Sequence, residues 1–337
     1  MKTLRFLGTA LIATLMCVAC SNEEIVPEEQ EAKYVTVNLG VTGEYLKVSE
    51  SPMDTRTTST LKDLIGIQVY TISDNNTEIK YAWGVFNSLE NVSIKLLAGE
   101  KYKFETSIIV DGYGCPEYLG HYSGLRNSCH DFSGYNLYPV GEDFNYSSDF
   151  ELKNFKDIPH YVNSNEDDKY KHDRFYGELV DYTPNENGTV EITTKRTAYG
   201  AHYIAEGLTE GNLKIEVTSN SDGEYTVNLT EEAPESNGIY GFRYIWSAWK
   251  GINGKDYYST KHLTISWTKD DGSETPLGTF DITFKRNIKT TIVIKVADPS
   301  QQNGIVVTKE ETRMTDDENK YVIEGGTITE VPVTSQQ

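Results

Sequence analysis

Hydrophobic and polar residues alternate with a period of two in short runs along most of the chain. Residues 34–39 and 65–70 are clear examples, rich in Val, Ile, Thr and Tyr and bounded by Gly, Asn or Asp. Such alternation is typical of β-strands that bury one face. It predicts further strands at 92–96, 101–110, 190–194, 213–218, 224–229, 263–268, 279–284 and 290–296. Few apolar runs have the period near 3.6 that marks a helix, so the sequence predicts an all-β fold.

The segments between these runs support the same conclusion. Residues 269–273, Lys-Asp-Asp-Gly-Ser, separate two predicted strands and contain the Asp-Gly pair that tolerates positive φ. We expect a hairpin there, and short strands at this spacing are typical of β-sandwiches. Residues 111–172 differ, because they are rich in Gly, Tyr, Asn and Ser and show weak periodicity. We interpret them as a long loop, and loops of that length are usually functional or partly disordered.

Composition also marks a boundary between two domains. Residues 182–188 are rich in Pro, Asn and Glu, and alternation starts again at Thr189. A chain of this length usually divides into two domains with separate cores. We therefore expect an N-terminal β-sandwich domain at 33–184, which includes the loop 111–172, and a C-terminal β-sandwich domain at 188–337.

The N-terminus has the features of an export signal. Two basic residues precede an apolar stretch at 6–18, which is too short to stay in a bilayer as a spanning helix. The small residues Val18 and Ala19 come directly before Cys20, as a lipoprotein signal peptidase requires. We expect residues 1–19 to be a signal peptide and Cys20 to be the lipidated, for example palmitoylated, N-terminus. Ordinary secretion without a lipid, or retention, is the alternative.

Acidic residues follow Cys20 in the sequence Ser-Asn-Glu-Glu at 21–24. This segment resembles the surface-export signal of Bacteroidetes lipoproteins. The resemblance implies a lipid anchor in the outer membrane, with the protein exposed on the cell surface. We expect residues 20–32 to form an acidic tether, and the alternative to an export signal is a plain tether at 23–32.

The net charge narrows the range of partners. The formal charge of the whole chain is −20, and loss of residues 1–19, which carry two basic residues and no acidic one, lowers it to −22. A chain this acidic is repelled by nucleic acid and by anionic lipid surfaces. We therefore expect no nucleic-acid partner.

Besides the lipidated Cys20, two cysteines, Cys115 and Cys129, remain after the signal peptide is removed. In an oxidising compartment they are a candidate disulfide that closes part of the long loop. His121 and His130 lie nearby and suggest zinc, but the spacing matches no compact ligand motif. We expect no metal site and no cofactor.

We find no recognisable catalytic motif in the sequence. It has no Gly-x-Ser-x-Gly elbow, no His-Glu-x-x-His and no phosphate-binding Gly loop. With 51 Asp and Glu residues, a carboxylate pair for glycoside hydrolysis cannot be singled out. We expect a protein that binds or assembles, not an enzyme, and keep an exported hydrolase as a minor alternative.

Aromatic residues in the second half of the chain suggest a different function. Trp246, Trp249 and Trp267 lie among several tyrosines. Aromatic faces bind sugar rings in many exported β proteins, so these three are candidate glycan contacts. Packing in the core is the default interpretation, because Trp and Tyr are also normal strand and core residues.

Several spaced motifs together resemble the fimbrillin family of Bacteroidales, the subunits and associated lipoproteins of type V pili. The resemblance covers nearly the whole chain, but no single motif in it is sharp. Its motifs are the acidic-flanked Cys20, Asp-Thr-Arg-Thr-Thr at 54–58 with the strand 64–71, the strand, Gly turn and strand at 92–104, Asp-Arg-Phe-Tyr-Gly-Glu at 173–178, the strand 190–196, and Arg286-Asn287 before the strand 290–294.

The resemblance implies two transthyretin-like β-sandwich domains in tandem, and assembly by strand exchange. In such assembly a protease cuts after an Arg that follows the first strand, and a neighbouring subunit fills the vacated groove. Arg56 lies where that cut would fall, which would make Thr57 the new N-terminus. Alternatively Arg56 is an ordinary loop residue, and an anchor subunit would keep its first strand and its lipid. The tail 304–337 would either donate a strand or form the last hairpin of the second domain.

Together these observations predict a surface lipoprotein that serves cell adhesion as a stalk, anchor or tip component of a type V fimbria. Its expected partners are other fimbrial subunits and a protein or glycan on a host or bacterial surface. It would lie on the outer membrane, or in the fimbria once it is processed. The alternative is a surface glycan-binding lipoprotein of a nutrient-uptake system, which would not polymerise.

Overall fold

The protein is built mainly from β-strands, which the computed structural model describes over several stretches of chain. The described residues are 32–45, 62–113, 143–152, 155–157, 172–219, 224–296, 306–314, 320–324 and 327–331. From Tyr34 onward they belong to one compact unit. No helix among these residues is long and apolar enough to cross a membrane.

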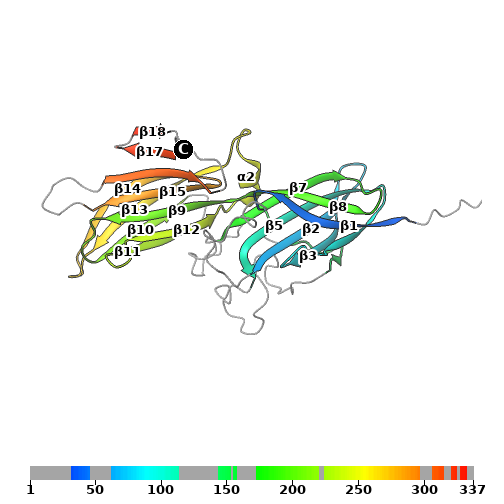
Figure 1. Cartoon of the computed structure of the whole chain (residues 1–337), viewed down its shortest axis with the longest axis horizontal. Coiled ribbons are helices and arrows are strands. Elements are labelled where there is room, and N and C mark those ends of the chain that lie inside the picture. The colour runs from blue at the N-terminus through cyan, green and yellow to red at the C-terminus, as the bar shows by residue number, and fades with distance from the viewer. Residues whose placement is uncertain are drawn as a thin grey trace, which may run out of the picture. The chain divides into compact units, whose positions relative to one another are not determined.

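The first eight strands form a sheet that turns a corner and faces itself (Figure 1). They are β1 (Tyr34–Gly43), β2 (Lys62–Ile72), β3 (Glu78–Phe86), β4 (Ser93–Leu97), β5 (Lys101–Tyr113), β6 (Asn145–Tyr146), β7 (Arg174–Tyr182) and β8 (Gly188–Arg196). The strand order is β4-β1-β8-β7-β5-β2-β3-β6. β7 and β8 meet through the pairs Phe175–Arg196 and Tyr176–Lys195, and this short contact forms the corner.

The core of this first sandwich lies between the layer β4-β1-β8 and the layer that contains β2 and β5. Val35, Val37 and Leu39 alternate with exposed residues along β1, and all three are buried. They share one apolar cluster with Ile67 of β2 and Phe104 of β5. The period-two pattern of β1 therefore places one face of the strand in a core, as expected for a half-buried strand.

The later strands form two further sheets that enclose a second core. They are β9 (Ala198–Glu206), β10 (Asn212–Thr218), β11 (Tyr225–Thr230), β12 (Glu235–Gly241), β13 (Tyr258–Thr268), β14 (Glu274–Lys285), β15 (Ile288–Lys295), β16 (Val306–Arg313), β17 (Lys320–Glu324) and β18 (Thr327–Val331), with the short helix α2 (Ile245–Lys250) after β12. The sheets are β11-β10-β13-β14 and β12-β9-β15-β16-β17-β18. Ile215 and Ile265 of the first sheet pack with Tyr203 and Ile292 of the second.

The all-β prediction and the sandwich architecture are confirmed. Each of the ten runs predicted from alternation corresponds to a strand of the structure. The hairpin at 269–273 is also confirmed, because it joins the antiparallel strands β13 and β14. There the Lys269 N–H donates to the Ser273 carbonyl (2.9 Å), and Gly272 has a φ of 82°.

The strand β8 lies in a different place from the one we expected. We assigned it to the start of the C-terminal domain at 188–337, but it pairs with β1 and β7 in the first sheet. Its inward residues Val190 and Ile192 belong to the first core, whereas the second core begins with Tyr199 of β9. The Pro- and Asn-containing segment before β8 is therefore a turn between β7 and β8 within the first sandwich.

The described residues of the predicted loop 111–172 include the end of a strand and segments that pack on the first sandwich. β5 continues to Tyr113, and the described residues beyond residue 142 pack closely on the first sandwich. Phe144, Leu152 and Phe155 are buried there, and the Leu152 N–H donates to Gln68 Oε1 (2.9 Å). These buried side chains are isolated in the sequence and do not alternate with exposed ones. The period-two pattern therefore did not predict that they are buried.

Candidate functional site

The strand β1 is the element that the predicted strand exchange would remove. It lies between β4 and β8, and its pairing is staggered along its length. Residues 34–38 pair antiparallel with β4, while residues 37–43 pair parallel with β8. Because both edges of β1 are hydrogen-bonded, its removal would leave unpaired backbone groups on two neighbouring strands.

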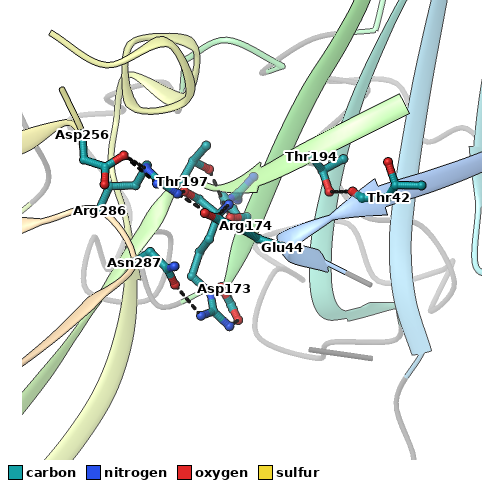
Figure 2. Close-up of polar contacts among 10 residues, drawn as sticks. Thr42, Glu44, Asp173, Arg174, Thr194, Thr197, Asp256, Arg286 and Asn287 are labelled. Atoms are coloured by element: carbon teal, nitrogen blue, oxygen red, sulfur yellow. Dashed lines mark hydrogen bonds and ion pairs between the residues drawn. The ribbon is translucent and has the colours of Figure 1, made fainter. Parts of the chain in front are cut away.

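Side chains reinforce the backbone pairing of β1 at both ends. Near its start, the Thr36 N–H donates to Asn187 Oδ1 (2.8 Å). Near its end, Thr194 Oγ1 donates to the Thr42 carbonyl (2.8 Å), as Figure 2 shows. The strand is thus held by apolar burial on one face and by polar contacts along its edges.

Glu44, the residue directly after β1, connects this strand to the second sandwich (Figure 2). Its Oε2 atom accepts hydrogen bonds from Arg286 Nη1 (2.7 Å) and from the Arg196 N–H (2.7 Å). Arg286 lies between β14 and β15, and its side chain is only 6% exposed. Charge-assisted hydrogen bonds of this length in a buried setting are among the stronger polar contacts in proteins.

A second carboxylate holds Arg286 from the other side. Asp256 Oδ1 accepts from Arg286 Nε (3.1 Å) and Nη2 (2.6 Å). Burial alone would lower the pKa of the Arg286 guanidinium, but Glu44 and Asp256 outweigh burial and raise that pKa above its ordinary value. Arg286 is therefore a fixed positive charge between two carboxylates.

Arg196, at the end of β8, forms the neighbouring ion pair. Its Nε and Nη2 atoms donate to the two carboxylate oxygens of Asp173 (2.8 and 2.9 Å). Its Nη1 atom donates to Asn287 Oδ1 (2.9 Å). The Arg286-Asn287 pair, known from the sequence only as a motif before a late strand, thus contacts the ends of β1 and β8.

The sequence did not identify Glu44, Arg196, Asp173 or Asp256 as site residues. Asp173, Arg196 and Arg286 were part of the motifs, but nothing in the motifs indicated which residues they contact. Glu44 and Arg286 are 242 positions apart in the chain. Pairing over that distance leaves no local pattern in a single sequence.

Most of the predicted site residues lie outside the described residues. These are Cys20, Arg56, Thr57, Cys115 and Cys129. The segment that contains Arg56 connects Tyr45, which follows β1, with Lys62, where β2 begins. The cut we predicted would therefore separate β1 from the rest of the sandwich in the covalent chain.

The three candidate glycan contacts are in the described part of the chain. Trp267 on β13 is 5% exposed, and its indole N–H donates to the Glu210 carbonyl (2.9 Å). This is the core packing that we took as the default interpretation. Trp246 and Trp249 of α2 are half-buried.

The two tryptophans of α2 have protein partners on the first sandwich. Trp246 Nε1 donates to Glu178 Oε1 (3.1 Å), and the Lys250 ammonium lies 4.4 Å from the centre of the Trp246 ring. Trp249 packs edge-on against Tyr176, with ring centres 5.6 Å apart. Both side chains therefore contribute to packing between α2 and β7.

No protein-family model matches the sequence. No curated protein matches it either.

Several solved structures are similar in their chain trace. A fimbrial assembly protein of Parabacteroides distasonis is 12% identical, with 86% of this chain and 98% of that chain covered and a TM-score of 0.37. A candidate adhesin of Bacteroides ovatus is 9% identical, with 90% and 97% covered and a TM-score of 0.40. A candidate polysaccharide-binding protein of Bacteroides thetaiotaomicron is 10% identical, with 90% and 99% covered and a TM-score of 0.39. All three TM-scores are below 0.5, so the fold described above rests on the strand pairing of this chain alone.

Proposed function

We propose that this protein is a surface-exposed component of a type V fimbria, that it serves cell adhesion, and that β1 is the strand exchanged during assembly. The main support is the position of β1 between β4 and β8, with its inward residues Val35, Val37 and Leu39 in the core. A strand bound on both edges and on one face leaves a groove of its own shape when it departs. A strand from a neighbouring subunit can bind such a groove by β-augmentation.

Proteolysis at Arg56 would start this exchange. The cut makes β1 a separate peptide that is held only by hydrogen bonds, apolar burial and the ion pair of Glu44 with Arg286. Each fully buried Val or Leu stabilises the bound strand by about 1.5–3 kcal/mol, so β1 leaves slowly. A donor strand that buries similar residues replaces β1 with little loss of stability. Once β1 has gone, the apolar residues of β4 and β8 are open to a donor strand.

An anchor subunit with the same fold would work without this cut. It would keep β1 in place and stay attached to the outer membrane through a lipid on Cys20. Both forms place the protein on the cell surface. They differ in whether the chain begins at Cys20 or at Thr57.

The tail is a less suitable donor than a strand from another subunit. β16 pairs with β15, and β17 and β18 extend the same sheet by antiparallel pairing. This is the arrangement of a last hairpin in the second sandwich. A tail that acted as donor would first have to leave this sheet.

Polymer formation tests the proposal directly. We expect protein from the native cell surface to run as a ladder of bands in warm detergent, because a donated strand is released only when the sandwich opens. Arg56→Ala should abolish the ladder, and Ser59→Ala in the same segment is the matched control. A ladder that persists in Arg56→Ala, or a monomer in every variant, would contradict exchange of β1 by this cut.

The second candidate function is glycan binding at the cell surface. The half-buried aromatic rings of Trp246 and Trp249 on α2 are the observation that favours it. A glycan-binding protein would run as a monomer and would be retarded in gels that contain the glycan. Retardation that is lost in Trp246→Ala and kept in Trp267→Phe would favour this candidate.

A further inference from the structure

We propose that the groove of β1 selects a donor strand that ends in a glycine followed by a carboxylate residue. This inference rests on the proposed strand exchange and adds a chemical rule for the incoming strand. Arg286 and the Arg196 N–H form a receptor for a carboxylate at the position that Glu44 now occupies.

The receptor remains in the protein when β1 departs. Arg286 is held by Asp256, which lies before β13, and the backbone of Arg196 is held where β8 pairs with Phe175 of β7. Neither Asp256 nor β7 is part of β1 or of the segment that leads to Arg56. Loss of β1 therefore removes Glu44 but leaves the two donor groups oriented toward the same point.

An incoming strand without a carboxylate would leave those donors without their acceptor. Arg286 is almost fully buried, so its Nη1 group would lose a charge-assisted hydrogen bond that little water can replace. The Arg196 N–H would lose its acceptor at the same time. The same apolar strand would thus bind more weakly without the acid.

The residue before the carboxylate is restricted by its backbone and by its neighbours. Gly43 has a φ of 87°, a backbone conformation that residues other than glycine rarely adopt. A Cβ atom at this position would lie 2.4 Å from the Thr194 carbonyl oxygen. Thr194 belongs to β8 and stays in the protein, so the donor must also present a glycine there.

These two requirements define the partner by its sequence. Its strand carries apolar residues at positions equivalent to Val35, Val37 and Leu39, and then a Gly-Glu or Gly-Asp pair equivalent to Gly43 and Glu44. The tail 304–337 contains no glycine followed by an acidic residue. The rule therefore favours a strand from outside this tail as the donor.

Synthetic peptides can test the rule on the full mature chain. A recognition sequence for a specific protease is inserted into the segment 46–61, the chain is cut there, and labelled peptide 34–44 with an amidated C-terminus is added in mild denaturant. After return to buffer, the amount of peptide bound is measured by fluorescence anisotropy. A second peptide carries Glu44→Gln, and a third carries Glu44→Gln together with Asn38→Asp, which restores the net charge at an exposed position.

We expect the native peptide to bind about tenfold more tightly than either Gln peptide. In a chain with Arg286→Gln the native and Gln peptides should bind about equally. Lys289→Gln, a matched loss of charge on β15, should preserve the tenfold difference in affinity. If the native and Glu44→Gln peptides bind the unaltered chain equally, the carboxylate rule is wrong although strand exchange stands. If no peptide enters the groove, the proposed exchange itself is wrong.

Discussion

Arg286 makes contacts that a lysine in its place could not reproduce. Its planar guanidinium donates to Glu44 on one side and to Asp256 on the other, and Nη1 also donates to the Arg196 carbonyl (3.1 Å). A lysine ammonium is a point charge without this fixed fork. Arg286 thus links the end of β1 to the turn between β14 and β15 by hydrogen bonds.

Replacement of Glu44 tests how much this contact stabilises the fold. Glu44→Gln keeps the shape of the side chain but removes the charge that pairs with the buried Arg286. We expect the free energy of unfolding to fall by about 1–3 kcal/mol, measured by chemical denaturation. Glu191→Gln, an exposed position on β8, is the control and should change it by less than about 0.5 kcal/mol. Equal effects of the two replacements would show that the contact adds no stability.

We expect the free energy of unfolding to fall at alkaline pH because of two tyrosines in the second core. Tyr203 and Tyr225 share a buried hydrogen bond of 2.8 Å, and burial raises the pKa of both well above its ordinary value. In the unfolded chain these groups lose their protons near pH 10, while the folded chain keeps them. The stabilisation is therefore complete below about pH 10 and is lost as the pH rises above it.

The expected slope is about 1.4 kcal/mol per pH unit for each buried tyrosine above pH 10. Tyr203→Phe should remove the contribution of one tyrosine from the slope, measured by denaturation between pH 8 and 11. The same replacement at Tyr258, which is exposed, is the control. An unchanged slope in Tyr203→Phe would contradict the burial that we describe.

At the scale of elements, β1 combines strong burial with pairing on both sides, yet it is the strand proposed to leave. The strong binding of β1 and its departure are compatible if the strand that replaces β1 makes the same contacts. Leu39 lies in the core at the point where pairing passes from β4 to β8. A change at this residue should therefore weaken the hold of the whole strand.

Leu39→Ala should lower the free energy of unfolding by about 2–5 kcal/mol, because it leaves a cavity in the first core. After a cut in the segment 46–61, the same replacement should also speed the release of β1, measured by size-exclusion chromatography of the cut protein. Asn38→Ala, whose side chain is exposed, should change neither quantity by much. Slow release in both variants would mean that apolar burial does not hold β1.

Alternation predicted β2 and β5, which are buried on both faces but still alternate in polarity, and missed β3. β3 has no regular pattern in its second half because both of its faces are covered. Trp83 and Val85 pack in the cluster that includes Ile245 of α2, while Ala82 and Phe86 lie in the first core. Where both faces of a strand carry apolar residues, the apolar run is unbroken and a period-two pattern is not visible.

At the scale of the whole molecule, the ionic contacts around Arg196 and Arg286 join residues from both sandwiches. Asn287 contacts Arg196 of β8, and Arg286 contacts Glu44 after β1. The sequence predicted the strands on either side of these residues, since alternation is a local signal. It could not predict the contacts themselves, because long-range pairs form only when both sandwiches are folded.

In the proposed assembly, β1 is removed by a cut at Arg56 and replaced by a strand from another subunit. The intact mass of the protein recovered from the surface of the cells that produce it shows directly whether this cut occurs. We expect a chain that begins at Thr57 for a polymerising subunit. A lipidated chain that begins at Cys20 in every assembled form would contradict removal of β1.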